Sequence, residues 1–102
     1  MARVKVATVA ALEAGRVYYV EAEGRSIAIC PVGDKVYAID DVCTHDGGAL
    51  DQGWLDGNLV ECPRHGARFD CITGRAVTLP AVRPVRTYPV TVEDGDVVIE
   101  IE

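Results

Sequence analysis

The chain has 102 residues, a formal net charge of −6 and 49% apolar residues. A chain of this length buries roughly 65% of its unfolded surface, enough for one modest core. We therefore expect residues 1–102 to form a single domain. The acidic balance argues against nucleic acid as a partner, because nucleic-acid binding needs a basic face. No stretch reaches the roughly 18 apolar residues that a membrane helix requires, so we expect no membrane contact.

The apolar run from Val6 to Leu12 faintly resembles the start of a signal peptide. It lies at the short limit for such a segment, and Glu13 ends it. We therefore expect a cytoplasmic protein.

Short β-rich segments with Gly and Asp turns between them dominate the chain. They are expected at 4–9, 16–20, 26–30, 35–39, 54–55, 59–60, 88–92 and 97–101. Asp94-Gly95 between two alternating runs predicts a hairpin over 88–101, the strongest of these signals. No window shows a helical stripe, and residues 10–14 can make one turn at most. The pattern predicts an all-β fold, an antiparallel sandwich or small barrel.

Four cysteines leave two broad interpretations open. In a secreted small domain they would form two disulfides, whereas in a reducing compartment clustered cysteines more often bind metal or act in catalysis. Both histidines of the chain follow a cysteine by two or three residues, in the segments Cys43-Thr44-His45 and Cys62-Pro63-Arg64-His65. A hairpin-like stretch separates the segments, so each is expected as a loop at one end of a sheet.

Three hypotheses account for these segments. The cysteines and histidines have no joint role, or they form a tetrahedral zinc site, or they hold a [2Fe–2S] cluster with cysteines on one iron and histidines on the other. A zinc site usually takes two cysteines from one knuckle and two histidines from another, whereas each loop here supplies one of each. The spacing C-x-H followed by C-x-x-H therefore favours the mixed-ligand cluster, which is the Rieske arrangement.

From about Val36 onward the sequence resembles the Rieske ferredoxins, in particular the small ferredoxin components of bacterial aromatic-ring dioxygenase systems. The matching elements are Cys43-Thr44-His45, Leu50, Gly53-Trp54-Leu55-Asp56-Gly57, Cys62-Pro63-Arg64-His65-Gly66, Phe69-Asp70, Thr73-Gly74, Pro80-Ala81 and Pro84. The resemblance implies a cluster-binding subdomain, at about 42–84, inserted into a base of antiparallel strands. It implies that Cys43 and Cys62 hold the buried iron and His45 and His65 the outer one. It also implies that the segment around Pro80 covers the cluster from a third side.

The function implied by the resemblance is that of a soluble one-electron carrier. It would pass electrons from an NAD(P)H-dependent, flavin-containing reductase to a terminal ring-hydroxylating oxygenase, as a monomer with transient protein partners. Alternatives are a Rieske-type small subunit of a nitrite reductase, a stand-alone ferredoxin, or a structural zinc-binding interaction module. No nucleophile and base are paired, and both histidines are assigned to the metal. We therefore expect a carrier and not an enzyme.

Three further features have simpler interpretations. Cys30 and Cys71 have no histidine at ligand spacing and are expected as free, buried thiols. Trp54 opens the predicted strand 54–55; a place on an electron path is one alternative, and packing in the interior is the expectation. Carboxylates near the ligand loops either form an acidic docking rim or are ordinary turn residues: Asp46, Asp51 and Asp56.

Overall fold

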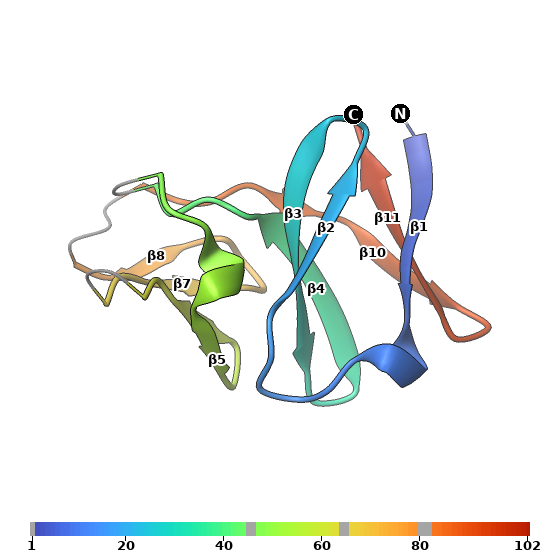
Figure 1. Cartoon of the computed structure of the whole chain (residues 1–102), viewed down its shortest axis with the longest axis horizontal. Helices are drawn as coiled ribbons and strands as arrows, with labels where there is room; N and C mark the ends of the chain where they lie inside the picture. The colour runs from blue at the N-terminus through green and yellow to red at the C-terminus, as the bar shows by residue number, and fades with distance from the viewer. Residues whose placement is uncertain (1, 45–46, 64–65, 80–82) are drawn as a thin grey trace.

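A computed structural model describes residues 2–44, 47–63, 66–79 and 83–102. Three antiparallel sheets make up the fold (Figure 1). The first contains β1 (Ala2–Thr8), β11 (Asp96–Ile101) and β10 (Val90–Glu93), in the order β1-β11-β10. It therefore joins the two ends of the chain.

The second sheet has the order β2-β3-β4-β9. Its strands are β2 (Tyr18–Ala22), β3 (Arg25–Val32), β4 (Lys35–Asp40) and β9 (Thr87–Tyr88). Together with the first sheet it forms the base of the protein, around a core of Ala22, Ile27, Ile29, Ala38, Tyr88, Ile99 and Ile101. β11 shows why this packing forms, since Val97, Ile99 and Ile101 alternate with less buried residues.

The third sheet lies in the insertion, residues 41–86, which leaves the base after β4 and returns at β9. Its order is β5-β6-β7-β8, with β5 (Trp54–Asp56), β6 (Leu59–Glu61), β7 (Arg68–Asp70) and β8 (Ala76–Thr78). The insertion forms one end of the molecule and the base the other, along the longest dimension of 38 Å (Figure 1). This arrangement confirms the expected all-β base with an inserted subdomain at about 42–84.

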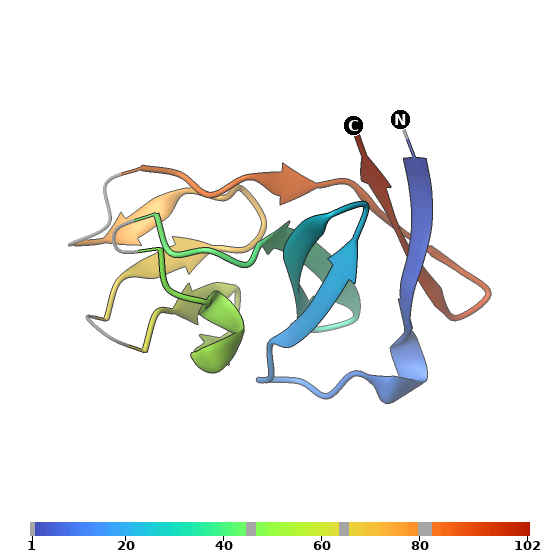
Figure 2. The same cartoon turned by 45° about the horizontal axis from the view of Figure 1, so that its top comes forward.

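A second core joins the insertion to the base. Ala28, Cys30 and Ile39 reach it from the base, and Leu55, Val60 and Phe69 reach it from the third sheet. All six side chains are buried. Because the two parts share this core, the insertion is held against β3 and β4 over its inner face (Figure 2).

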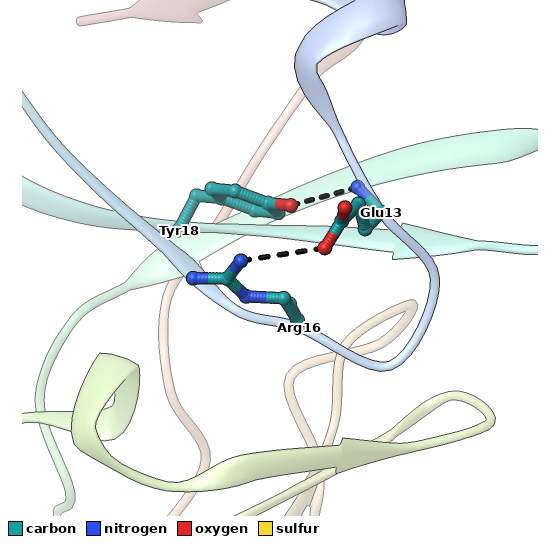
Figure 3. A network of polar contacts seen from close by, with 3 residues as sticks. All are labelled: Glu13, Arg16 and Tyr18. Carbon is teal, nitrogen blue, oxygen red and sulfur yellow. Dashed lines mark hydrogen bonds and ion pairs between the residues drawn. The ribbon is translucent and has the colours of Figure 1, made fainter.

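The connection from β1 to β2 also joins the two parts. In it the Glu13 amide donates a hydrogen bond of 2.7 Å to the Tyr18 hydroxyl, and Arg16 pairs with the Glu13 carboxylate at 3.3 Å (Figure 3). The Arg16 guanidinium also lies over the Tyr18 ring, 5.3 Å from its centroid. This network fixes the loop so that Val17 packs against the core shared with the insertion.

The strands expected from sequence appear with shifted ends, and the hairpin over 88–101 is confirmed as β10 and β11. Val9 was expected at the end of the first strand, but it begins the 3₁₀ helix Val9–Ala11. This helix overlaps residues 10–14, where one turn was expected. β7 and β8 were missed: unlike the equally short β5 and β6, they have no Asp-Gly turn between them to mark a hairpin. The expectation for Trp54 was wrong: its side chain lies on the outer face of β5 and is 51% exposed.

None of the helices in the described ranges is long and apolar enough to cross a membrane.

Candidate metal centre

Cys43 and Cys62 open two loops that have the same backbone hydrogen bonds. The amide of each cysteine donates to the carbonyl five residues later, Cys43 to Gly48 at 2.7 Å and Cys62 to Ala67 at 2.8 Å. The carbonyl of each cysteine accepts from the amide four residues later, that of Gly47 at 2.7 Å and that of Gly66 at 3.2 Å. The described ends of the two loops therefore share one pattern of backbone hydrogen bonds.

Glycine is required at the same place in each loop. Gly47 has φ 77° and Gly66 has φ 75°, in the left-handed region that other residues rarely enter. Each glycine turns its amide back to the cysteine carbonyl and so closes the loop. The sequence signal was a glycine four residues after each cysteine.

Both cysteine side chains are buried in the core shared by the base and the insertion. Cys43 and Cys62 are 0% and 1% exposed, and Leu50, Val60 and Phe69 belong to the same cluster. Two thiols on matched loops, shielded from water by apolar side chains, suit a soft metal centre with thiolate ligands. The two cysteines would therefore supply two of the four ligands that a cluster with mixed Cys and His ligands needs.

The other predicted ligands, His45 and His65, lie outside the described residues, as do Asp46, Arg64 and Pro80. Their place in the sequence is two residues after Cys43 and three after Cys62.

The return segment, residues 83–86, lies beside the first ligand loop. The Thr44 hydroxyl donates to the Arg83 carbonyl at 2.7 Å. The Val85 amide donates to the Gly74 carbonyl at 2.7 Å, and the Asp40 amide donates to the Arg86 carbonyl at 2.9 Å. The described part of the predicted third side is thus fastened to the ligand loop, to the turn after β7 and to β4.

A buried carboxylate organises the chain after the first loop. Asp41 is 8% exposed, and its Oδ1 accepts a hydrogen bond of 2.7 Å from the Asp51 amide. Asp51 belongs to the 3₁₀ helix Leu50–Gln52, which places Leu50 in the core. Burial raises the pKa of Asp41 to about 7. Sequence reasoning missed this residue, because nothing local distinguishes it from the neighbouring Asp40.

The remaining cysteines form a separate pair. Cys30 on β3 and Cys71 after β7 are buried in the shared core, and their side chains are hydrogen-bonded to each other. This bond and burial raise the pKa of the Cys30 thiol far above its ordinary value. All four cysteines are described and none is in a disulfide, so the prediction of free, buried thiols is confirmed and the two-disulfide alternative is wrong.

Residues 2–89 match the family described as Rieske [2Fe-2S] domain. The ferredoxin component of the naphthalene 1,2-dioxygenase system of Pseudomonas aeruginosa is 40% identical over 87 residues, which cover 85% of this chain and 84% of that one.

Solved structures agree in fold over nearly the whole chain. The ferredoxin of carbazole 1,9a-dioxygenase from Nocardioides aromaticivorans IC177 is 35% identical, with a TM-score of 0.96 and full coverage of both chains. A complex of reduced oxygenase and oxidized ferredoxin in carbazole 1,9a-dioxygenase contains a chain that is 33% identical, with a TM-score of 0.91 and coverage of 98% of this chain and 97% of that one.

Proposed function

We propose, because the chain belongs to the Rieske [2Fe-2S] domain family, that it carries electrons from a flavin-containing, NAD(P)H-dependent reductase to a terminal ring-hydroxylating oxygenase. Its relatives are ferredoxin components, so the chain is an electron carrier with one [2Fe–2S] cluster and not an enzyme. The family match also removes the structural zinc module as an alternative. When bound, the cluster accepts and releases a single electron.

The proposed ligands are Cys43 and Cys62 on one iron and His45 and His65 on the other. The matched hydrogen bonds of the two loops and the burial of both thiols support the cysteine half of this set. The position of each histidine shortly after its cysteine supports the other half. The chain holds the thiolates in an apolar core and keeps water away from them.

The proposed acceptor follows from the relatives. One curated relative is named as a component of a naphthalene dioxygenase system, and one structural relative is a ferredoxin in a complex with its oxygenase. We further propose that residues 1–102 act as one domain and as a cytoplasmic monomer that binds each partner transiently. Size-exclusion chromatography with light scattering tests the monomer.

The visible spectrum and the EPR spectrum of anaerobically purified, dithionite-reduced protein test the cluster. We expect a brown protein whose reduced form gives the anisotropic, low-average-g signal of a histidine-ligated cluster. A colourless protein that carries zinc after careful reconstitution would contradict the proposal.

Single substitutions test the ligand assignment. Cys62→Ser, His45→Ala and His65→Ala should each abolish the EPR signal and the bound iron. Cys71→Ser is the matched control, because Cys71 is equally buried in the same core but is not a proposed ligand. Loss of iron in Cys71→Ser, or its retention in Cys62→Ser, would refute the assignment.

A further inference from the structure

The net charge of −6 is unevenly distributed between the two ends of the molecule. The insertion contains five basic and six acidic residues, so five of the six excess negative charges belong to the base. The molecule is 38 Å long, whereas the Debye length is about 8 Å at physiological salt. A protein that meets the insertion end therefore responds to local charges and not to the net charge.

One stretch, from the second half of the insertion into β10, is free of acidic residues. Residues 71–92 contain three arginines and no Asp or Glu. Arg86 lies over the Tyr88 ring, 5.2 Å from its centroid, and lines a hollow that Glu100 also lines. Its charge is therefore directed toward the acidic base. Arg75 and Arg83 are exposed, and neither forms an ion pair with an acidic group of the described residues.

Hydrogen bonds join the chain next to Arg75 to the return segment, and the return segment to a ligand loop. The Val85 amide donates to the carbonyl of Gly74. Arg75 follows Gly74 in the chain, and Val85 belongs to the return segment, so Arg75 and the return segment are neighbours. Figures 1 and 2 both show the return segment running alongside β8. The carbonyl of Arg83 accepts from Thr44, the residue that follows Cys43.

Exposed apolar side chains stand in the same stretch. Leu79 is 73% exposed, Val77 on β8 is 50% exposed, and Ile72 in the turn after β7 is 46% exposed. Apolar side chains with arginines among them are the composition typical of protein interfaces. We call Arg75, Val77, Leu79 and Arg83 the arginine face.

One acidic residue of the third sheet lies at its other edge. Asp56 is on β5, and β8 is the opposite edge of this four-stranded sheet. Three strand spacings separate the two edges by about 14 Å, more than one Debye length. Closer to β8, Asp70 on β7 is engaged by the turn, since its Oδ1 accepts from the Ile72 amide at 2.8 Å. On β7 and β6, Arg68 and Glu61 neutralise each other at 2.7 Å.

We propose that the arginine face docks a redox partner whose contact surface carries carboxylates around an apolar centre. The proposal rests on the proposed function, because a carrier must dock partners near its cluster loops. The proposal makes the β8 edge of the third sheet locally positive, although the net charge of the protein is −6.

Ferricyanide, a multivalent anion, tests the local charge. Reduced holoprotein is mixed with ferricyanide in a stopped-flow instrument at potassium chloride concentrations from 0.1 M upward, where the Debye length is about 10 Å or less. We expect the oxidation rate constant to fall with salt, because screening weakens attraction to the arginines. A rate constant that rises with salt, as net repulsion from a protein of charge −6 requires, would overturn the proposal.

Two variants of equal net charge separate the arginine face from the rest of the molecule. Arg75→Gln with Arg83→Gln should slow the reaction about three- to tenfold at 0.1 M salt, where the Debye length is about 10 Å. Arg3→Gln with Lys5→Gln on β1, the matched control, should leave it nearly unchanged. Equal effects in the two variants would contradict the assignment.

A poly-L-glutamate peptide serves as the probe for docking. It should protect the parent protein from ferricyanide in a saturable manner and should protect the Arg75→Gln/Arg83→Gln variant far less. Equal protection of the two, or none, would refute the docking site. The visible and EPR spectra of the same samples report on the cluster, so failure of the carrier function is distinguishable from failure of the arginine face.

Discussion

The Val85 amide donates a hydrogen bond of 2.7 Å to the Gly74 carbonyl, and the two residues lie so close that Gly74 has no room for a side chain. A Cβ at Gly74 would overlap the Val85 carbonyl oxygen, and φ is 78°. Gly74→Ala should therefore displace the return segment and destabilise the protein by about 2–4 kcal/mol. Denaturant unfolding of the holoprotein measures this loss.

Gly33→Ala is the control for Gly74→Ala. Gly33 also has a positive φ, 61°, but no atom lies within 4 Å of its added Cβ. Gly33→Ala should lower the free energy of unfolding by about 1 kcal/mol, which is the cost of placing alanine at a positive φ. If the two variants lose equal stability, the close approach of Gly74 and Val85 has no energetic importance.

Thr44 links the first ligand loop to the return segment through a single hydroxyl. Thr44→Val keeps the shape but removes the donor to the Arg83 carbonyl, whereas Thr44→Ser keeps the donor. We expect Thr44→Val to lose about 1 kcal/mol of stability and to release iron faster on dilution into chelator. Thr44→Ser should behave like the parent protein, and a Ser variant as impaired as the Val variant would assign the effect to the methyl group.

The ligand pattern and the outer strands of the fold could be predicted from the sequence because their signals are local. Alternation of Val97, Ile99 and Ile101 indicates a strand, and C-x-H with C-x-x-H indicates the cluster. β7 was missed because no Asp-Gly turn leads from it to β8, so only its pairing with β6 and β8 identifies it as a strand. The exposure of Trp54 was also out of reach, because an aromatic between strands can face either side of a sheet.

Long-range contacts account for the rest of what the sequence did not predict. Asp41 and Asp51 are ten residues apart, Cys30 and Cys71 forty-one, and Thr44 and Arg83 thirty-nine. Nothing in a single sequence pairs such residues. Only the fold brings them together around the shared core.

The Asp41 carboxylate supports the 3₁₀ helix that places Leu50 beside Cys43 in the core. Asp41→Ala leaves the Asp51 amide without its acceptor, at a cost of about 1–3 kcal/mol. Asp41→Asn keeps an acceptor oxygen and avoids burying a charge, so its stability should remain close to that of the parent. Thermal unfolding at neutral pH compares them, and an Asn variant as unstable as the Ala variant would contradict the role of the hydrogen bond.

Cys30 and Cys71 pack against each other in the shared core without being proposed ligands. Burial and a raised pKa keep the Cys30 thiol protonated, so iodoacetamide should not modify it in the folded holoprotein. Unfolding with loss of the cluster should expose all four thiols of the chain. Cys30→Ala should lose about 1–2 kcal/mol by leaving a small cavity, while the visible spectrum of the cluster stays unchanged. Mass spectrometry of the alkylated protein gives the modified residues, and native modification at Cys30 would show that the shared core opens to solvent.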